Sequence, residues 1–180
     1  MSSEVHEIPR FDPAALARCR RRADLTQLAL AGRLTVHDNK IYRWEKGITP
    51  ITAAELRRVA RELRVVPPQL QLPLTAPPTM VDLRSLAALA PTELAARLHI
   101  KLHRLLLWEH GHLGGPDEHG PLLAAFIGIS ESAVDQHERT GLLPIALAVR
   151  LARALRVTPR LVAMAFDASR MADQNTHLAA

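Results

Sequence analysis

Five polar side chains occupy a six-residue stretch in the first third of the chain: Asp38, Asn39, Lys40, Tyr42 and Arg43. An amide and a guanidinium can each make two parallel hydrogen bonds to a flat partner, as Asn does with adenine and Arg with guanine. The carboxylate of Asp38 would be repelled by phosphate but could accept a hydrogen bond from the amino group of cytosine. On one face of a helix, this set predicts contact with base edges. The alternative is a set of ordinary solvated side chains.

The surrounding sequence predicts two short helices joined by a tight turn. Apolar residues recur three and four positions apart, as at Leu30 and Leu34, which is the helical period. We expect helices from about Gln27 to Leu34 and from about Asp38 to Lys46, with residues 35–37 as the turn. Trp44 would anchor the second helix inward, so that the polar set faces outward.

This unit is repeated along the chain. The sequence LTQLALAGRLTVHDNKIYRWEKG at residues 25–47 returns without a gap as LAPTELAARLHIKLHRLLLWEHG at residues 89–111, an offset of 64. A weaker third copy lies at residues 123–139, and LARALRVTPRL at 151–161 echoes VARELRVVPPQL at 59–70. Repetition indicates that one supersecondary unit was copied, but it does not say what the unit does.

The first copy resembles the helix-turn-helix of the phage-repressor family, also called Xre-like. The shared pattern is Leu-Thr-Gln, Leu-Ala, a hydrophobic turn position, Ile, Trp-Glu and Gly, within residues 13–70. The resemblance implies a five-helix bundle in which Gln27 binds phosphate. It also implies that His37, Asp38, Asn39 and Arg43 read bases. Thr35 stands where the family usually has Gly, and His37 stands where it has Ser or Thr.

The resemblance further implies a structural ion pair between Arg20 and Glu45, and their recurrence as Arg84 and Glu109 supports that role. We therefore predict a double-stranded DNA partner for one surface of the first copy: Gln27, His37, Asp38, Asn39, Lys40, Tyr42, Arg43 and Lys46.

The later copies lack these features. Pro91 replaces Gln27 in the second copy, and an outward row of leucines replaces the presumed readers: Leu102, Leu106 and Leu107. Residues 117–139 hold five acids and one Arg, and this net negative charge opposes phosphate binding by the third copy. We expect these copies to form one bundle that pairs as a homodimer or binds a protein partner.

Composition and breaks in the helical pattern give the domain plan. No segment alternates like a strand, so the predicted fold is all-α: a five-helix repressor-type domain plus a second domain of degenerate helix-turn-helix repeats. Residues 1–75 hold 13 Lys and Arg and 8 Asp and Glu, a net charge of +5, whereas residues 76–180 hold 10 of each. The predicted segments are a flexible 1–10, a helix-turn-helix domain at 11–70, a Pro-rich linker at 71–79, a helical domain at 80–167 (repeats 81–115 and 121–167), and a flexible tail at 168–180.

An enzyme is the first competing interpretation. The chain has a loose group of possible metal ligands: His99, His103, His110, His112, Asp117 and His119. Their spacing matches no known zinc motif, so solvated histidines are favoured. We interpret Cys19, which carries the single thiol, as a small core residue. With no glycine-rich phosphate loop and no nucleophile motif, we predict no catalytic residues, no metal and no cofactor.

The functional prediction is a sequence-specific DNA-binding transcription regulator, with repression as the expected mode. The alternative is a protein-interaction module or an antitoxin that uses the same fold. The first ten residues are polar and no apolar run approaches the ~20 residues that span a bilayer, which predicts a cytoplasmic, nucleoid-associated protein with no membrane partner.

Overall fold

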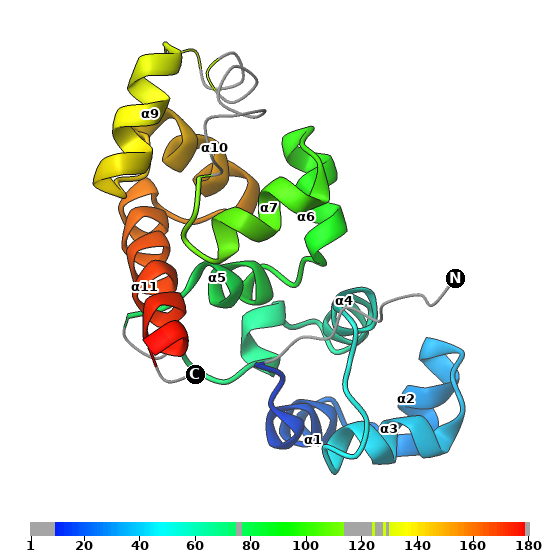
Figure 1. Ribbon diagram of the computed structural model, residues 1–180. Coiled ribbons are helices and arrows are strands. Elements are labelled where there is room, and N and C mark those ends of the chain that lie inside the picture. Colours follow the sequence, from blue (N-terminus) through cyan, green and yellow to red (C-terminus); the bar gives the residue numbers. More distant parts are fainter. Residues whose placement is uncertain (1–9, 75–76, 114–123, 125–127, 129, 179–180) are drawn as a thin grey trace. The chain divides into compact units, whose positions relative to one another are not determined.

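The computed structural model describes residues 10–74, 77–113, 124, 128 and 130–178 (Figure 1). The described part is all-α, and its extended pairing is limited to one isolated bridge between Phe11 and Gln71. The chain divides into two compact units. Unit 1 comprises Met1–Pro73 with Ser85–Ala90, and unit 2 comprises Leu74–Arg84 with Pro91–Ala180.

Unit 1 consists of four α-helices and a 3-10 turn, which are α1 (Pro13–Arg22), α2 (Gln27–Leu34), α3 (Asp38–Glu45), α4 (Ala53–Glu62) and η1 (Pro67–Leu70). Local sequence explains where they begin. The Asp12 carboxylate accepts a hydrogen bond from the Ala14 amide at 2.9 Å, with Pro13 in the first turn. At the start of α4, Thr52 and Glu55 form a reciprocal capping box.

The core of unit 1 is made of aliphatic side chains and one tryptophan from α1, α2, α3 and α4. Its most buried members include Leu16, Leu30, Ile41, Trp44, Leu56 and Val59. Because Ile41 and Trp44 point inward from α3, the opposite side of that short helix must face solvent. The apolar period therefore fixes which residues α3 presents.

The first residues of the predicted linker, from residue 71, pack with unit 1. Gln71 is buried, and the Leu72 amide donates a hydrogen bond to the Arg10 carbonyl at 2.8 Å. The Asp12 amide likewise donates to the Leu70 carbonyl at 3.0 Å. This pairing holds both ends of unit 1 together, so the unit runs to Pro73. The predicted flexible residues 1–9 lie outside the described part.

Unit 2 contains α5 (Met80–Leu86), α6 (Pro91–Leu98), α7 (Leu102–Glu109), α9 (Glu131–Thr140), α10 (Ile145–Leu155) and α11 (Pro159–Leu178). Helix α10 packs against α6, just as α4 packs against α2 in unit 1. Gly111, after α7, has a φ of 80°, and a Cβ there would come within 2.5 Å of the Arg170 backbone nitrogen. A glycine is needed because α11 passes this close to the end of α7.

Left-handed backbone conformations recur at matching positions of the two units. Thr35 and His99, 64 residues apart, have φ of 53° and 55° directly after α2 and α6. Arg64 and Arg156, 92 residues apart, have φ of 55° and 59° after α4 and α10. The offset therefore grows from 64 to 92 between α7 and α10, where unit 2 holds the additional helix α9.

The segment from residue 168, predicted as a flexible tail, is helical in the structure, because α11 continues to Leu178. Ala168 and Ser169 are buried, and the Met80 amide donates a hydrogen bond to Ser169 Oγ at 3.0 Å. Small buried side chains and this bond hold a segment that its polar composition alone would leave frayed. Of the predicted third copy, residues 123, 125–127 and 129 lie outside the described part.

Among the described residues, no helix combines the length and the apolar character needed to cross a bilayer.

Candidate nucleic-acid interface

The outward face of α3 rests on a buried ion pair between α1 and α3. Arg20 Nε lies 2.6 Å from Glu45 Oε1, and Arg20 Nη2 donates to Glu45 Oε2 at 3.1 Å. The two side chains are 12% and 7% exposed. Arg20 Nη1 also donates to the Leu25 carbonyl at 2.6 Å, so a single guanidinium fixes α1, α3 and the start of α2.

This environment keeps both partners charged. Burial alone would raise the pKa of Glu45, but hydrogen bonds from Arg20 and Gln27, with the charges of Arg20 and Arg21, hold that pKa below its ordinary 4.5. The hydrogen bond to Glu45 raises the pKa of Arg20 and outweighs the opposing effect of its burial.

Gln27, the predicted phosphate contact, joins the same network. Its Nε2 donates to Glu45 Oε2 at 2.7 Å, and the side chain is half-buried. The amide is thereby held at the first position of α2, directly after the cap residue Thr26. The ion pair thus orients a hydrogen-bonding side chain at a helix amino terminus, where backbone N–H groups favour anions.

The α3 face consists of five exposed residues: Asp38, Asn39, Tyr42, Arg43 and Lys46. Tyr42 is 44% exposed, a large value for an aromatic side chain. His37 caps the helix, since its Nδ1 accepts from the Asn39 amide at 3.3 Å. His37 is itself exposed beside Asp38, so it occupies the capping position that the family usually gives to Ser or Thr.

Lys40 differs from its neighbours on α3. Its Nζ lies 2.5 Å from Glu55 Oε1 and 5.2 Å from the centroid of the Trp44 ring. Burial would raise the pKa of Glu55, but hydrogen bonds from Lys40 and Thr52 hold it below 4.5. Lys40 is therefore tied to α4, unlike the residues of the α3 face.

Beside the α3 face runs a groove of about 610 Å³ between α3 and the start of α4. It is lined by His37, Asn39, Lys40, Arg43, Trp44, Thr49, Pro50, Thr52 and Glu55. Two of its polar atoms, Trp44 Nε1 and Thr49 Oγ1, are buried without a hydrogen-bond partner among the described residues. Buried polar groups are rarely left unpaired, so we expect an ordered water or another hydrogen-bonding partner at these two atoms.

Sequence reasoning missed Thr49. The repeat could have drawn attention to it, because the residue 64 positions later, Leu113, is apolar where Thr49 is polar. In unit 2, Trp108 Nε1 donates to the Leu113 carbonyl at 3.3 Å, so the corresponding indole is satisfied internally.

The remainder of α7 also differs from α3. Leu106 is 39% exposed, while Leu102 and Leu107 are half-buried, so the predicted leucine row is only partly accessible within unit 2. The ion pair is retained, with Arg84 Nε 2.5 Å from Glu109 Oε1 and side chains 7% and 3% exposed.

The predicted histidine group is dispersed. His110 Nδ1 and His112 Nε2 lie 3.6 Å and 3.0 Å from the Asp173 carboxylate, and His99 and His103 are exposed elsewhere. Asp117 and His119 lie outside the described residues. In the part of the chain that the structure describes, no three His, Cys, Asp or Glu side chains are grouped so as to hold a metal ion.

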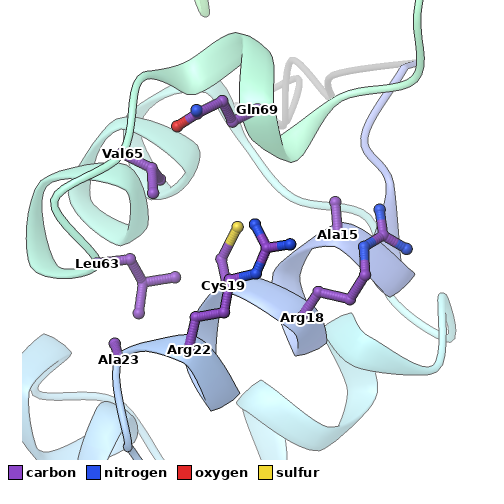
Figure 2. Close-up of a pocket in the computed structure, with 8 residues that line it drawn as sticks. All are labelled: Ala15, Arg18, Cys19, Arg22, Ala23, Leu63, Val65 and Gln69. Atoms are coloured by element: carbon purple, nitrogen blue, oxygen red, sulfur yellow. The ribbon is translucent and has the colours of Figure 1, made fainter.

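Cys19 was expected in the core and lies at its edge. It is half-buried on α1, packs against the core, and lines a hollow of about 320 Å³ with Arg22, Leu63 and Val65 among its neighbours (Figure 2).

Comparison with known proteins finds a family model that matches unit 1. Residues 14–72 match the family model of a helix-turn-helix domain, a segment that spans α1 to η1. No curated protein and no solved structure matches the chain. Unit 1 thus has the fold of a helix-turn-helix domain, with α2 and α3 as its two central helices.

Proposed function

We propose that this protein is a sequence-specific regulator of transcription, of the phage-repressor type, that reads the major groove of double-stranded DNA with α3. The observation that supports it best is the α3 face. Five polar side chains point away from a core fixed by Ile41 and Trp44, on a helix that the Arg20–Glu45 pair locks in place. A helix of this diameter fits the major groove.

The side chains of the α3 face suit distinct base contacts. Asn39 can pair with adenine and Arg43 with guanine, each through two hydrogen bonds. Asp38 can accept from cytosine, and the exposed ring of Tyr42 offers an apolar edge to a thymine methyl group. These roles require the residues to reach base edges, which their exposure at the start of α3 allows.

Phosphate contacts would flank this helix on both sides. Gln27 and the amino terminus of α2 supply donors on one side. On the other side lies the groove lined by Trp44 and Thr49, and the exposed Lys46 adds a positive charge. The net charge of +5 in residues 1–75 favours the same polyanion.

The protein would repress transcription if, once bound, it blocks access to a promoter. Pairing as a homodimer would strengthen its binding to DNA. Two-fold pairing places two recognition helices about 34 Å apart, one turn of DNA. We assign this pairing to unit 2, where Leu106 is exposed on α7. Such a protein would act at the nucleoid.

The exposed Leu106 on α7 also supports a second candidate function, that of an antitoxin. In that case unit 1 still binds DNA, but Leu106 and its half-buried neighbours on α7 would contact a different protein. The oligomeric state of the purified protein separates the two candidates. A homodimer would support the repressor, whereas a monomer would favour an antitoxin that binds a different protein.

The test is a selection of binding sites from random duplex DNA with the full chain, at a stated salt concentration. We expect one enriched motif, palindromic if the protein pairs two-fold. Arg43→Ala should weaken binding to it by roughly 1–3 kcal/mol and relax one base position. The matched control is Arg33→Ala, an exposed arginine on α2, which should keep the motif. No enrichment by the wild type would end the proposal, and an unchanged motif with Arg43→Ala would remove that residue's role.

A further inference from the structure

Unit 2 carries a concentrated positive charge at the junction of α10 and α11. The arginine patch comprises Arg150, Arg153, Arg156 and Arg160, all exposed. No Asp or Glu occurs from residue 144 to residue 166, so this stretch of sequence carries positive charges and no negative ones. Arg153, Arg156 and Arg160 form no ion pair within the described part of the chain.

The patch is a local feature and not a reflection of overall charge. Residues 76–180 hold 10 Lys and Arg and 10 Asp and Glu and are therefore neutral in total. Five of these acids lie between residues 117 and 139, with a single Arg. Charge is thus unevenly distributed in the second half of the chain, and four of its ten Lys and Arg lie around one helix junction.

The four arginines lie between residues 150 and 160, and the chain passes from α10 to α11 within this stretch. Arg150 and Arg153 are three residues apart on α10, so they share one side of that helix. Arg156 ends α10 in a left-handed conformation with a φ of 59°. Arg160 follows in the first turn of α11, where Thr158 Oγ1 accepts from the Leu161 amide at 3.3 Å.

Three of these arginines have counterparts in unit 1. Arg58 and Arg61 of α4 and Arg64 directly after it stand 92 positions before Arg150, Arg153 and Arg156. Arg58 has a structural contact, since its Nη2 donates to the Leu34 carbonyl. The later two positions are exposed in both units. Basic residues therefore recur on the fourth helix of the fold, although the polar residues of the α3 face do not recur on α7.

We propose that the arginine patch binds phosphate groups of the nucleic-acid backbone without reading sequence, so that unit 2 adds salt-sensitive affinity to the recognition by unit 1. This inference rests on the proposed function. Arginine forms paired hydrogen bonds with phosphate oxygens. A duplex held by unit 1 also raises the effective concentration of phosphates around a tethered unit 2. The contact uses α10 and α11, and not the leucine-bearing helix α7.

The test compares two double variants of the full chain that remove equal charge from unit 2. R153Q/R160Q removes two arginines of the patch, and R97Q/K101Q removes two exposed charges of α6 and its following turn. Binding to a duplex with the selected motif and to a duplex without it is measured over a range of salt concentrations. Each lost phosphate contact lowers the slope of log affinity against log salt by about 0.9, so R153Q/R160Q should lower it by roughly 2 on both duplexes.

The control variant should retain the wild-type slope, and R153K/R160K should restore it. All variants should keep the preference for the motif. Equal slopes for the wild type and R153Q/R160Q, or an equal loss in both double variants, would overturn the inference while leaving the proposed function intact. An unchanged slope together with a changed oligomeric state would instead assign the patch to an acidic protein surface, which also overturns it. Absence of any binding by the wild type would defeat the proposed function itself.

Discussion

Helices α3 and α7 occupy corresponding places in units 1 and 2, yet their outward residues have different chemistry. Each helix ends in Trp-Glu, and each Glu pairs with an arginine 25 residues earlier, at 2.6 Å for Arg20 and 2.5 Å for Arg84. The outward positions are polar and charged on α3 but carry leucines on α7. The comparison separates residues that hold the fold, which both units keep, from the outward residues that we propose contact a partner, which only unit 1 has in polar form.

The two tryptophans sharpen this distinction. Both are buried, but Trp108 donates its indole N–H to the Leu113 carbonyl, whereas Trp44 Nε1 has no partner within the described residues. In unit 1 the indole N–H is thus unpaired among the described residues, whereas in unit 2 the corresponding N–H is paired internally. A buried polar group left unpaired costs stability, so the two units differ in how this indole is accommodated.

The largest effect should come from breaking the more buried ion pair. Glu109→Ala strands the charge of Arg84, and we expect unit 2 to lose about 3–5 kcal/mol of unfolding free energy. Urea unfolding can follow each unit separately, since Trp44 and Trp108 are the two tryptophans and each can be replaced by Phe. The double variant R84M/E109M should recover much of the loss. If Glu109→Ala unfolds like the wild type, the pair does not hold the fold.

Thr49→Val tests whether the groove of unit 1 is built for an external partner. Removing an unpaired hydroxyl should leave the unfolding free energy unchanged or slightly higher. Affinity for the selected DNA site should fall by roughly 1–2 kcal/mol if Oγ1 donates to phosphate. Thr92→Val, at an exposed position on α6, is the matched control and should change neither quantity. Wild-type affinity with Thr49→Val would mean that the groove has no part in binding.

Thr35→Gly should stabilise unit 1. Thr35 is a β-branched residue at a φ of 53°, a conformation that glycine adopts without strain. We expect a gain of up to about 1 kcal/mol after the entropy cost of glycine, visible as a higher melting temperature. His99→Gly, at a φ of 55° in unit 2, should act in the same direction. A lower melting temperature for both variants would show that these side chains make contacts that outweigh the backbone strain.

Acid should produce the smallest effect, and Glu55 should account for part of it in unit 1, beside Glu45. Because the pKa of Glu55 in the folded protein lies below its ordinary 4.5, its contribution to stability is present above pH 4.5 and is lost as the pH falls through the lowered pKa. Glu55→Gln should therefore make the unfolding free energy of unit 1 less sensitive to acid. Glu62→Gln, on the same helix, serves as the comparison. Equal acid sensitivity in the wild type and Glu55→Gln would rule out this contribution.

The sequence predicted those parts of the structure that depend on local spacing. The bounds of α2 and the start of α3 follow from the apolar period, whereas the Arg20–Glu45 pair was implied by the family resemblance and supported by its recurrence at an offset of 64. It could not predict the helical end of α11, because that depends on the distant contact between Met80 and Ser169. Nor could it reveal the groove or the tie between Lys40 and Glu55, which arise only when α4 packs beside α3.

The central claim is that the α3 face recognises DNA sequence. It is tested most directly by transferring the residues of α7 onto α3, as D38L/Y42L/R43L, and repeating the selection from random duplex DNA with the full chain. We predict that the wild type enriches one motif, and that the variant keeps its helical circular dichroism but enriches none. Enrichment of the same motif by the variant would contradict the account.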